Sequence, residues 1–75
     1  VRLEKRALEV QGFLPTPPSG FTLRTAVDET CVDVVVWVEC PGHMRKVRVH
    51  EADRREDVLE RVAQTIAHLQ ADRDG

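Results

Sequence analysis

Valine alternates with other residues through the middle of the chain, and this pattern constrains the fold more than any other feature. Residues 31–40 read Cys-Val-Asp-Val-Val-Val-Trp-Val-Glu-Cys. Side chains along a β-strand point alternately to its two faces, so one face of this segment carries β-branched residues suited to a buried, pleated surface. These residues are Val32, Val34, Val36 and Val38. The other face carries Val35 and Trp37 with an acid on either side, so we expect a strand with one buried side and one open side.

A preceding strand is predicted over residues 21–27, where apolar and polar residues alternate before Asp28 and Glu29. A two-residue turn at this acidic pair predicts the register of the first hairpin. That register places Leu23 opposite Val34, Phe21 opposite Val36, and Arg24 opposite Asp33 as an ion pair. The acidic pair is not the Asn-Gly typical of two-residue hairpin turns, so a longer loop is the alternative.

A third strand is predicted over residues 45–50, after a Pro-Gly pair. Proline presets the first central φ of a type II turn and glycine accepts positive φ at the second, so this pair predicts a hairpin turn. A loop of two residues places Lys46 opposite Trp37, and a loop of four places Arg48 there. Both loops put a cation on the same face as the indole.

Apolar residues at helical spacing predict a first helix over about residues 2–11. Its apolar side comprises Leu3, Ala7, Leu8 and Val10. Gly12 is placed to end the helix as a left-handed C′ residue. The proline-rich segment 15–20 cannot continue a helix, so we expect an extended connector there.

A second helix is predicted over about residues 54–70, where the apolar stripe consists of Val58, Leu59, Val62, Ile66 and Leu69. Asp53 and Glu56 have the spacing of a capping box. In that motif the first acid accepts from the third helical amide and the glutamate bonds back to the cap. Residues 72–75 are expected to form a frayed end.

Together these elements predict one small α+β domain over residues 1–75, with the order α-β-β-β-α. The strands form a three-stranded antiparallel meander, and both helices pack on its valine-rich face because each helical stripe needs a sheet to cover it. A domain of 75 residues is only marginally stable, so docking into a larger assembly would add stability. No apolar run approaches the ~20 residues that span a bilayer, and we expect no membrane partner.

The two cysteines are expected to be free thiols. Cys31 and Cys40 flank the valine strand and would lie about 30 Å apart, too far for a disulfide between them. The start of the chain lacks the apolar segment of a signal peptide. We therefore expect an intracellular, reducing compartment. The chain begins with Val1, and we expect either a processed protein or an excised domain.

The sequence offers no catalytic or metal-binding motif of the usual kinds. Cys40 and His43 flank a turn, but structural zinc takes four Cys or His ligands in local pairs, and the chain has two cysteines and three histidines at scattered positions. The same pair lacks an orienting third group for nucleophilic catalysis. The glycines are isolated, so no phosphate-binding loop is present. We expect no enzymatic activity, no metal and no cofactor.

The open face of the predicted sheet is the candidate functional surface. A tryptophan within a ring of charged residues matches the anatomy of protein interfaces. We therefore predict a protein–protein interaction or assembly module that contacts a partner, or a second copy, through this face. The predicted contact residues are Val35, Trp37, Glu39, Lys46 and Arg48. In a homodimer Arg48 and Glu39 of two copies would pair, and the first or third strand offers edge pairing as a further mode.

RNA binding is the alternative function. The net charge of −2 gives no overall attraction for nucleic acid, but the predicted helices carry Arg2, Lys5, Arg6, Arg54 and Arg55. The element order and the basic pair at the second helix resemble the double-stranded-RNA-binding domain family, which implies RNA contact through these helices. That family's small residues are replaced here by Leu59-Glu-Arg-Val62, and Pro41-Gly-His43 precedes the third strand rather than joining the first two. The order is also similar to that of secretion-chaperone-like domains that dimerise.

Overall fold

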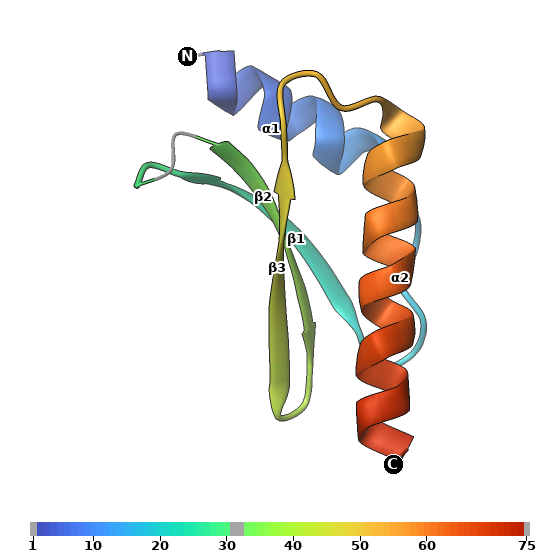
Figure 1. Cartoon of the computed structure of the whole chain (residues 1–75). Coiled ribbons are helices and arrows are strands. Elements are labelled where there is room, and N and C mark those ends of the chain that lie inside the picture. The colour runs from blue at the N-terminus through green and yellow to red at the C-terminus, as the bar shows by residue number, and fades with distance from the viewer. Residues whose placement is uncertain (1, 31–32, 75) are drawn as a thin grey trace.

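The computed structural model describes residues 2–30 and 33–74 and has two helices and three strands in the predicted order (Figure 1). The elements are α1 (Arg2–Phe13), β1 (Thr22–Asp28), β2 (Asp33–Cys40), β3 (His43–Val49) and α2 (Arg55–Asp74). The strands form one antiparallel sheet in the order β1-β2-β3, so the valine-rich strand is central. The α+β class and the α-β-β-β-α order are confirmed. Cys31 and Val32 lie outside the described residues.

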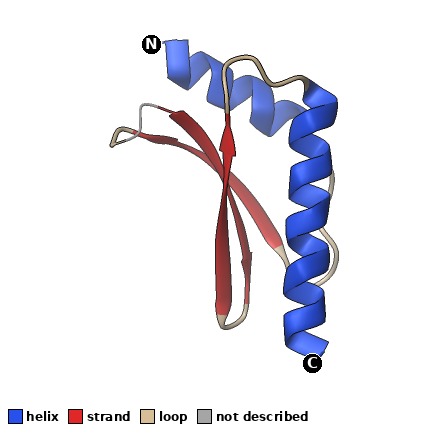
Figure 2. Cartoon of the chain, in the orientation of Figure 1, coloured by secondary structure: helices blue, strands red, loops and turns tan. Residues whose placement is uncertain are grey.

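Both helices pack on the valine-rich face of the sheet, here called the inner face, and enclose one hydrophobic core. The buried core residues are Val10 of α1, Phe21, Val34, Val36 and Val38 of β2, Val47 and Val49 of β3, and Val58, Val62 and Leu69 of α2. In Figure 2, α1 crosses the top of the view and α2 runs down its right side. The helices therefore cover different parts of the inner face, α1 over β1 and β2 and α2 over β2 and β3.

The first hairpin has a different register from the predicted one. Asp28 itself pairs with Asp33, so four residues connect the two strands instead of two. Arg24 accordingly lies opposite Trp37. The predicted pairs Leu23–Val34, Phe21–Val36 and Arg24–Asp33 are wrong. Asp-Glu is poorly suited to the positive φ angles of a two-residue hairpin turn. The register has moved by an even number of residues, so each side chain keeps its predicted face.

The second hairpin has the shorter of the two loops that the sequence left open. Cys40 pairs directly with His43, so the Pro-Gly pair alone forms the loop. Gly42 has φ of +81°, the value that the second central residue of a type II turn requires. The strand begins at His43, before its predicted start, and Lys46 lies opposite Trp37.

Two details of the first helix differ from the prediction. Gly12 lies inside α1, which continues to Phe13, and it is not among the described glycines with positive φ. The expectation that it ends the helix as a left-handed residue is therefore wrong. Leu8 is 74 % exposed, although the helical spacing of apolar residues predicts it on the buried side. It lies two positions from the buried Val10, and two residues along a helix point to nearly opposite sides.

The cap of α2 is displaced by one residue from the predicted capping box. The Arg54 amide donates to the Asp57 carboxylate at 3.0 Å, so Arg54 is the cap and Asp57 the third helical residue. The Asp53–Glu56 box is wrong because the Asp53 carboxylate binds a backbone amide before the helix and an arginine within it. The helix also continues to Asp74, past its predicted end near residue 70 and into the segment 72–75 that was expected to fray. No helix in the described part of the chain combines the length and apolar character needed to cross a membrane.

Candidate functional site

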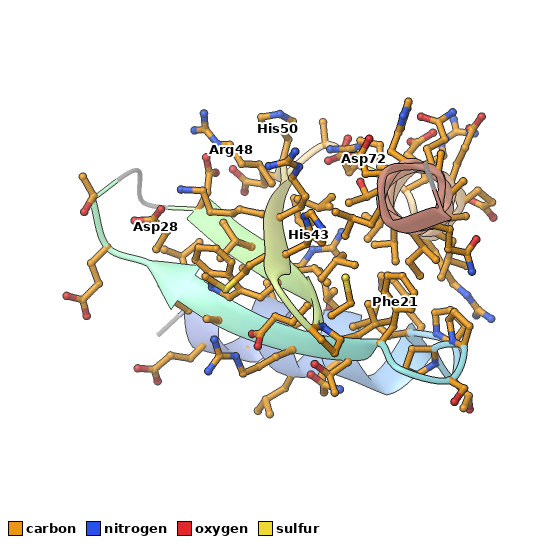
Figure 3. All side chains as sticks on the ribbon, turned by 90° about the horizontal axis from the view of Figure 1, so that it is seen from below. Phe21, Asp28, His43, Arg48, His50 and Asp72 are labelled. Atoms are coloured by element: carbon orange, nitrogen blue, oxygen red, sulfur yellow. The ribbon has the colours of Figure 1, made fainter. Side chains whose placement is uncertain are left out.

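The face of the sheet opposite the helices, here called the outer face, is defined by the strand register. It carries Thr22, Arg24, Ala26 and Asp28 of β1, Asp33, Val35, Trp37 and Glu39 of β2, and Met44, Lys46 and Arg48 of β3. Figure 3 shows the division, with Phe21 and α2 on one side of β3 and Asp28 and Arg48 on the other. All five predicted partner-binding residues lie on the outer face.

Val35 points to the outer face but is only 1 % exposed, so the expectation that it offers open contact area is wrong. It does not belong to the helix-covered core, and its cover comes from outer-face neighbours. The Lys46 ammonium of β3 pairs with the Asp28 carboxylate of β1 at 3.1 Å, so the lysine side chain crosses the central strand. Both residues are diagonal neighbours of Val35 in the register. The aliphatic stem of the lysine therefore shields the valine.

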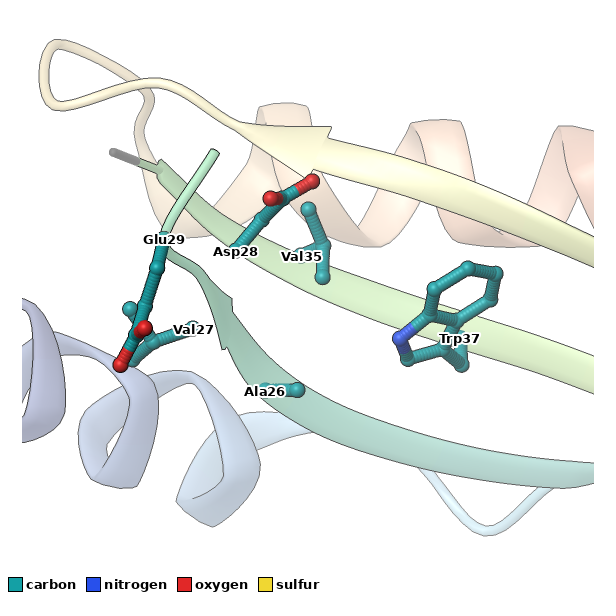
Figure 4. Close-up of a pocket in the computed structure, with 6 residues that line it drawn as sticks. All are labelled: Ala26, Val27, Asp28, Glu29, Val35 and Trp37. Atoms are coloured by element: carbon teal, nitrogen blue, oxygen red, sulfur yellow. The ribbon is translucent and has the colours of Figure 1, made fainter. Parts of the chain in front are cut away.

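Trp37 is half-buried on this face, and the Lys46 ammonium lies 5.8 Å from the centre of its ring system. The predicted placement of a cation beside the indole is thus confirmed. A hollow of about 360 Å³ opens next to the ring. It is lined by Ala26, Val27, Asp28, Glu29, Val35 and Trp37 (Figure 4). Its floor is apolar and its rim toward the first hairpin loop is acidic.

Three cross-strand ion pairs surround the indole. They join Arg24 to Glu39 at 3.0 Å, Lys46 to Asp28 at 3.1 Å and Arg48 to Asp33 at 2.6 Å. The first replaces the predicted pair of Arg24 with Asp33. All three pairs are partly exposed, so each contributes only about 0–1 kcal/mol to stability. Their six charged groups form the polar border of the apolar centre of this face.

Met44 is a surface residue that sequence reasoning missed. It lies opposite Glu39 on the outer face, diagonal to Trp37, and is 54 % exposed. Methionine adapts its shape to many partners and is common at interfaces. The Pro-Gly turn contained the signal, because a two-residue loop extends the third strand back to His43 and thereby assigns a face to Met44.

Arg6, one of the basic residues of the RNA alternative, joins α1 to the segment between β3 and α2. One of its guanidinium nitrogens donates to the Asp53 carbonyl at 2.9 Å and the other pairs with Glu9 at 3.3 Å. Its Nε is buried without a hydrogen-bond partner. This arginine is therefore largely occupied by contacts within the chain.

The other basic residues of that set lie on the same end of the molecule or outside the described side chains. The Arg55 guanidinium lies 6.0 Å from the centre of the Phe13 ring, which joins the start of α2 to the end of α1. Lys5 and Arg54 are exposed, and the side chain of Arg2 lies outside the described residues. The structure thus places two exposed cations, Arg54 and Arg55, near the meeting of the helices, and Lys5 is exposed on α1.

Asp53 and Arg61 fasten α2 to the end of β3. The Asp53 carboxylate accepts from the His50 amide at 2.6 Å and pairs with Arg61. The hydrogen bond from Arg61 lowers the pKa of the Asp53 carboxyl below its ordinary value, against an opposing effect of burial and with help from the His50 amide. Arg61 also donates to the Arg48 carbonyl at 2.6 Å. All of these contacts lie within the chain and connect α2 to the end of β3.

Among residues 2–30 and 33–74, no group of three histidine, cysteine or acidic side chains is arranged to hold a metal ion. Cys40 carries a half-buried free thiol, and its backbone lies opposite that of His43 in the second hairpin. Comparison of the chain with known protein families, curated proteins and solved structures finds no match.

Proposed function

We propose that the chain is a non-catalytic protein–protein interaction module that contacts its partner through the outer face around Trp37. The observation that carries this proposal is that the half-buried Trp37 and the exposed Met44 are neighbours on a face that also carries three cross-strand ion pairs. Both helices occupy the opposite face of the sheet. Aromatic residues, methionine and arginine are enriched in interfaces, where an apolar centre is surrounded by a polar rim.

The apolar area of the outer face suits a contact of moderate strength. Burying a fully exposed tryptophan contributes about 4–6 kcal/mol before ordering costs. Trp37 is already half-buried, so the free energy left to gain is smaller. Met44, at 54 % exposure, adds apolar area beside it, whereas Val35 serves as the floor and adds almost none.

The charges of the outer face define what a partner must supply. Its three acids each have a cation within the chain, so the face is balanced and needs no partner of strong opposite charge. A suitable partner offers an apolar group to the indole and the hollow, with polar groups around it. A second copy of the chain is the homodimeric variant. Its predicted Arg48–Glu39 pair would require both residues to leave their present partners, Asp33 and Arg24.

The test is a comparison of Trp37→Ala with Leu8→Ala in sedimentation velocity and in co-purification with tagged protein. Leu8 is an exposed apolar residue of α1 and is the matched control. The proposal expects Trp37→Ala to lose assembly while Leu8→Ala keeps it, with both far-UV spectra unchanged. Sedimentation of the purified chain shows whether it associates with itself or requires a second protein as its partner. Assembly that survives Trp37→Ala in a folded chain refutes the proposal.

RNA binding is a second candidate, supported by the exposed cations near the meeting of the two helices. Phosphate contacts by arginine and lysine supply most non-specific affinity and weaken with salt. The expected result is duplex RNA binding that falls from low to high salt and weakens further in an Arg54→Gln, Arg55→Gln variant. A dissociation constant weaker than about 10⁻⁴ M at low salt would exclude this function.

A further inference from the structure

The two edges of the sheet are covered to different extents. On β1, the Thr25 amide and hydroxyl both donate to the Gln11 side-chain oxygen of α1, at 3.2 and 2.7 Å. An amide that bonds to a helix side chain in this way points away from the neighbouring strand. Gln11 therefore covers the middle of the β1 edge, where an added strand would need to bond.

The bonding of Thr25 also determines which backbone groups of β3 point outward. Thr25 lies opposite Val36, and Val36 lies opposite Val47. In an antiparallel sheet, the amide and carbonyl of each residue point to the same side, and the side alternates along the strand. Because the backbone groups of Thr25 point outward, those of Val36, directly opposite, also point away from this strand pair and therefore toward β3. The backbone groups of Val47, opposite Val36, bond back to β2. The outward-bonding residues of β3 are therefore Met44, Lys46 and Arg48.

Only part of this β3 edge is covered by a helix. Arg61 of α2 donates to the Arg48 carbonyl at 2.6 Å, which agrees with the outward direction of that group. Within the described chain, no hydrogen bond reaches the outward backbone groups of Met44 or Lys46. The amide and carbonyl of both residues are thus available to an added strand. Met44, at 54 % exposure, lies at the open end of this edge.

The charge of β3 indicates what kind of strand fits. β3 carries Arg45, Lys46 and Arg48 and no acid. Arg45 has no ion partner among the described residues, whereas Lys46 and Arg48 are paired on the outer face. Two copies joined along β3 would bring cations opposite cations, which is destabilising in a sheet. An acidic strand would instead meet the unpaired Arg45 on the inner face, and it would bring no further cation to Lys46 and Arg48 on the outer face.

We propose that an extended, acidic segment of a partner protein adds to β3 as a fourth strand, bonding to the backbone of Met44 and Lys46. Such strand addition takes its affinity from main-chain hydrogen bonds and its selectivity from alternate side chains. The inference goes beyond the proposed function, because it concerns the sheet edge and does not require the outer face to bind.

The first test uses two short fluorescent peptides, one alternating glutamate and valine and the other alternating lysine and valine. The acidic peptide is expected to bind in fluorescence anisotropy, more weakly at high salt, and the basic peptide is not. In ¹⁵N NMR spectra, the largest amide shifts are expected at Met44 and Lys46, with slowed hydrogen exchange at both. Equal binding of the two peptides, or no binding of the acidic one, would overturn the proposal.

The second test is a pair of variants at Met44. Met44→Pro removes an outward amide that the bond to β2 does not use, so an edge strand tolerates it. Met44→Leu keeps the amide and a similar apolar volume. The proline variant is expected to bind the acidic peptide about tenfold more weakly, as for one lost hydrogen bond, and the leucine variant to bind normally. An acidic peptide N-methylated at alternate residues makes the same test on the unaltered protein.

The outcomes also separate this inference from the proposed function. Trp37→Ala is expected to leave peptide binding at the edge intact. Peptide-induced shifts centred on Trp37 instead of Met44 would place the peptide on the outer face and overturn strand addition. Concentration-dependent protection of the Lys46 amide without any peptide would identify a second copy as the occupant, and would overturn it as well.

Discussion

Replacing Leu69 by alanine is expected to remove a large share of the stability of the fold. Leu69 is fully buried (0 % exposed) near the end of α2, and the other buried residues of that helix, Val58 and Val62, lie in its first half. Truncating a buried leucine to alanine costs about 2–5 kcal/mol. A chain of 75 residues has a total stability of roughly 4–11 kcal/mol. A loss of about 3 kcal/mol corresponds to a fall in Tm of about 12–24 °C.

The assay is thermal and urea unfolding followed by far-UV circular dichroism and by the fluorescence of Trp37, the only tryptophan. Leu8→Ala is the control, because it makes the same chemical change at a side chain that is 74 % exposed. Its expected effect is within about 0.5 kcal/mol of zero. Equal effects of the two substitutions, or wild-type melting of Leu69→Ala, would refute the packing of the second half of α2 on the sheet.

Three further predictions concern local contacts. The pKa of the Asp53 carboxyl is lowered in the folded chain, mainly by Arg61, so the ionised carboxylate stabilises the fold above about pH 4, and this stabilisation is lost as the pH falls below that value. Asp53→Asn should therefore reduce the fall of the urea midpoint on acidification, and an unchanged fall would contradict this. Gly42→Ala should lower the free energy of unfolding by about 1 kcal/mol because φ is +81°. Gly12→Ala should raise it by about 0.5–1 kcal/mol, because Gly12 lies inside α1 and an added Cβ would meet nothing within 4 Å. A higher urea midpoint for Gly42→Ala than for Gly12→Ala would be inconsistent with both placements. Gln11→Ala should speed hydrogen exchange of the β1 amide that it accepts from, and unchanged protection would show that this edge is covered by something else.

The faces of the strands could be predicted from the sequence, whereas the first register could not. Alternation along residues 33–40 separates Val34, Val36 and Val38 from the charged residues whatever the neighbouring strand does, because it is a property of one strand. Register depends on loop length, and Asp28-Glu29 has no strong preference for a tight turn. Pro41-Gly42 does have such a preference, and that hairpin formed with one of its two predicted loops.

Part of the candidate site could also be predicted from the sequence. The face of Trp37 and its neighbour Lys46 followed from alternation and the turn. The burial of Val35 did not, since it depends on the path of a long lysine side chain to Asp28 across the central strand. Side chains of this length have many rotamers, and only the assembled sheet selects among them.

Helix ends were the least predictable local feature, because tertiary contacts competed with local capping. Asp53 is a favourable cap residue by type, yet its carboxylate binds Arg61 and the His50 amide. The cap moved by one residue, and Asp57 took over the bond back to the Arg54 amide. Nothing within the local sequence distinguishes these two arrangements.

Acrylamide quenching of Trp37 fluorescence tests most directly whether the outer face docks a protein partner. The measurement compares the isolated chain at low concentration with the chain in its purified assembly, whether that holds a second copy or another protein. Docking through the outer face predicts efficient quenching of the isolated chain and a several-fold smaller quenching constant in the assembly. The same quenching constant in both states would contradict it.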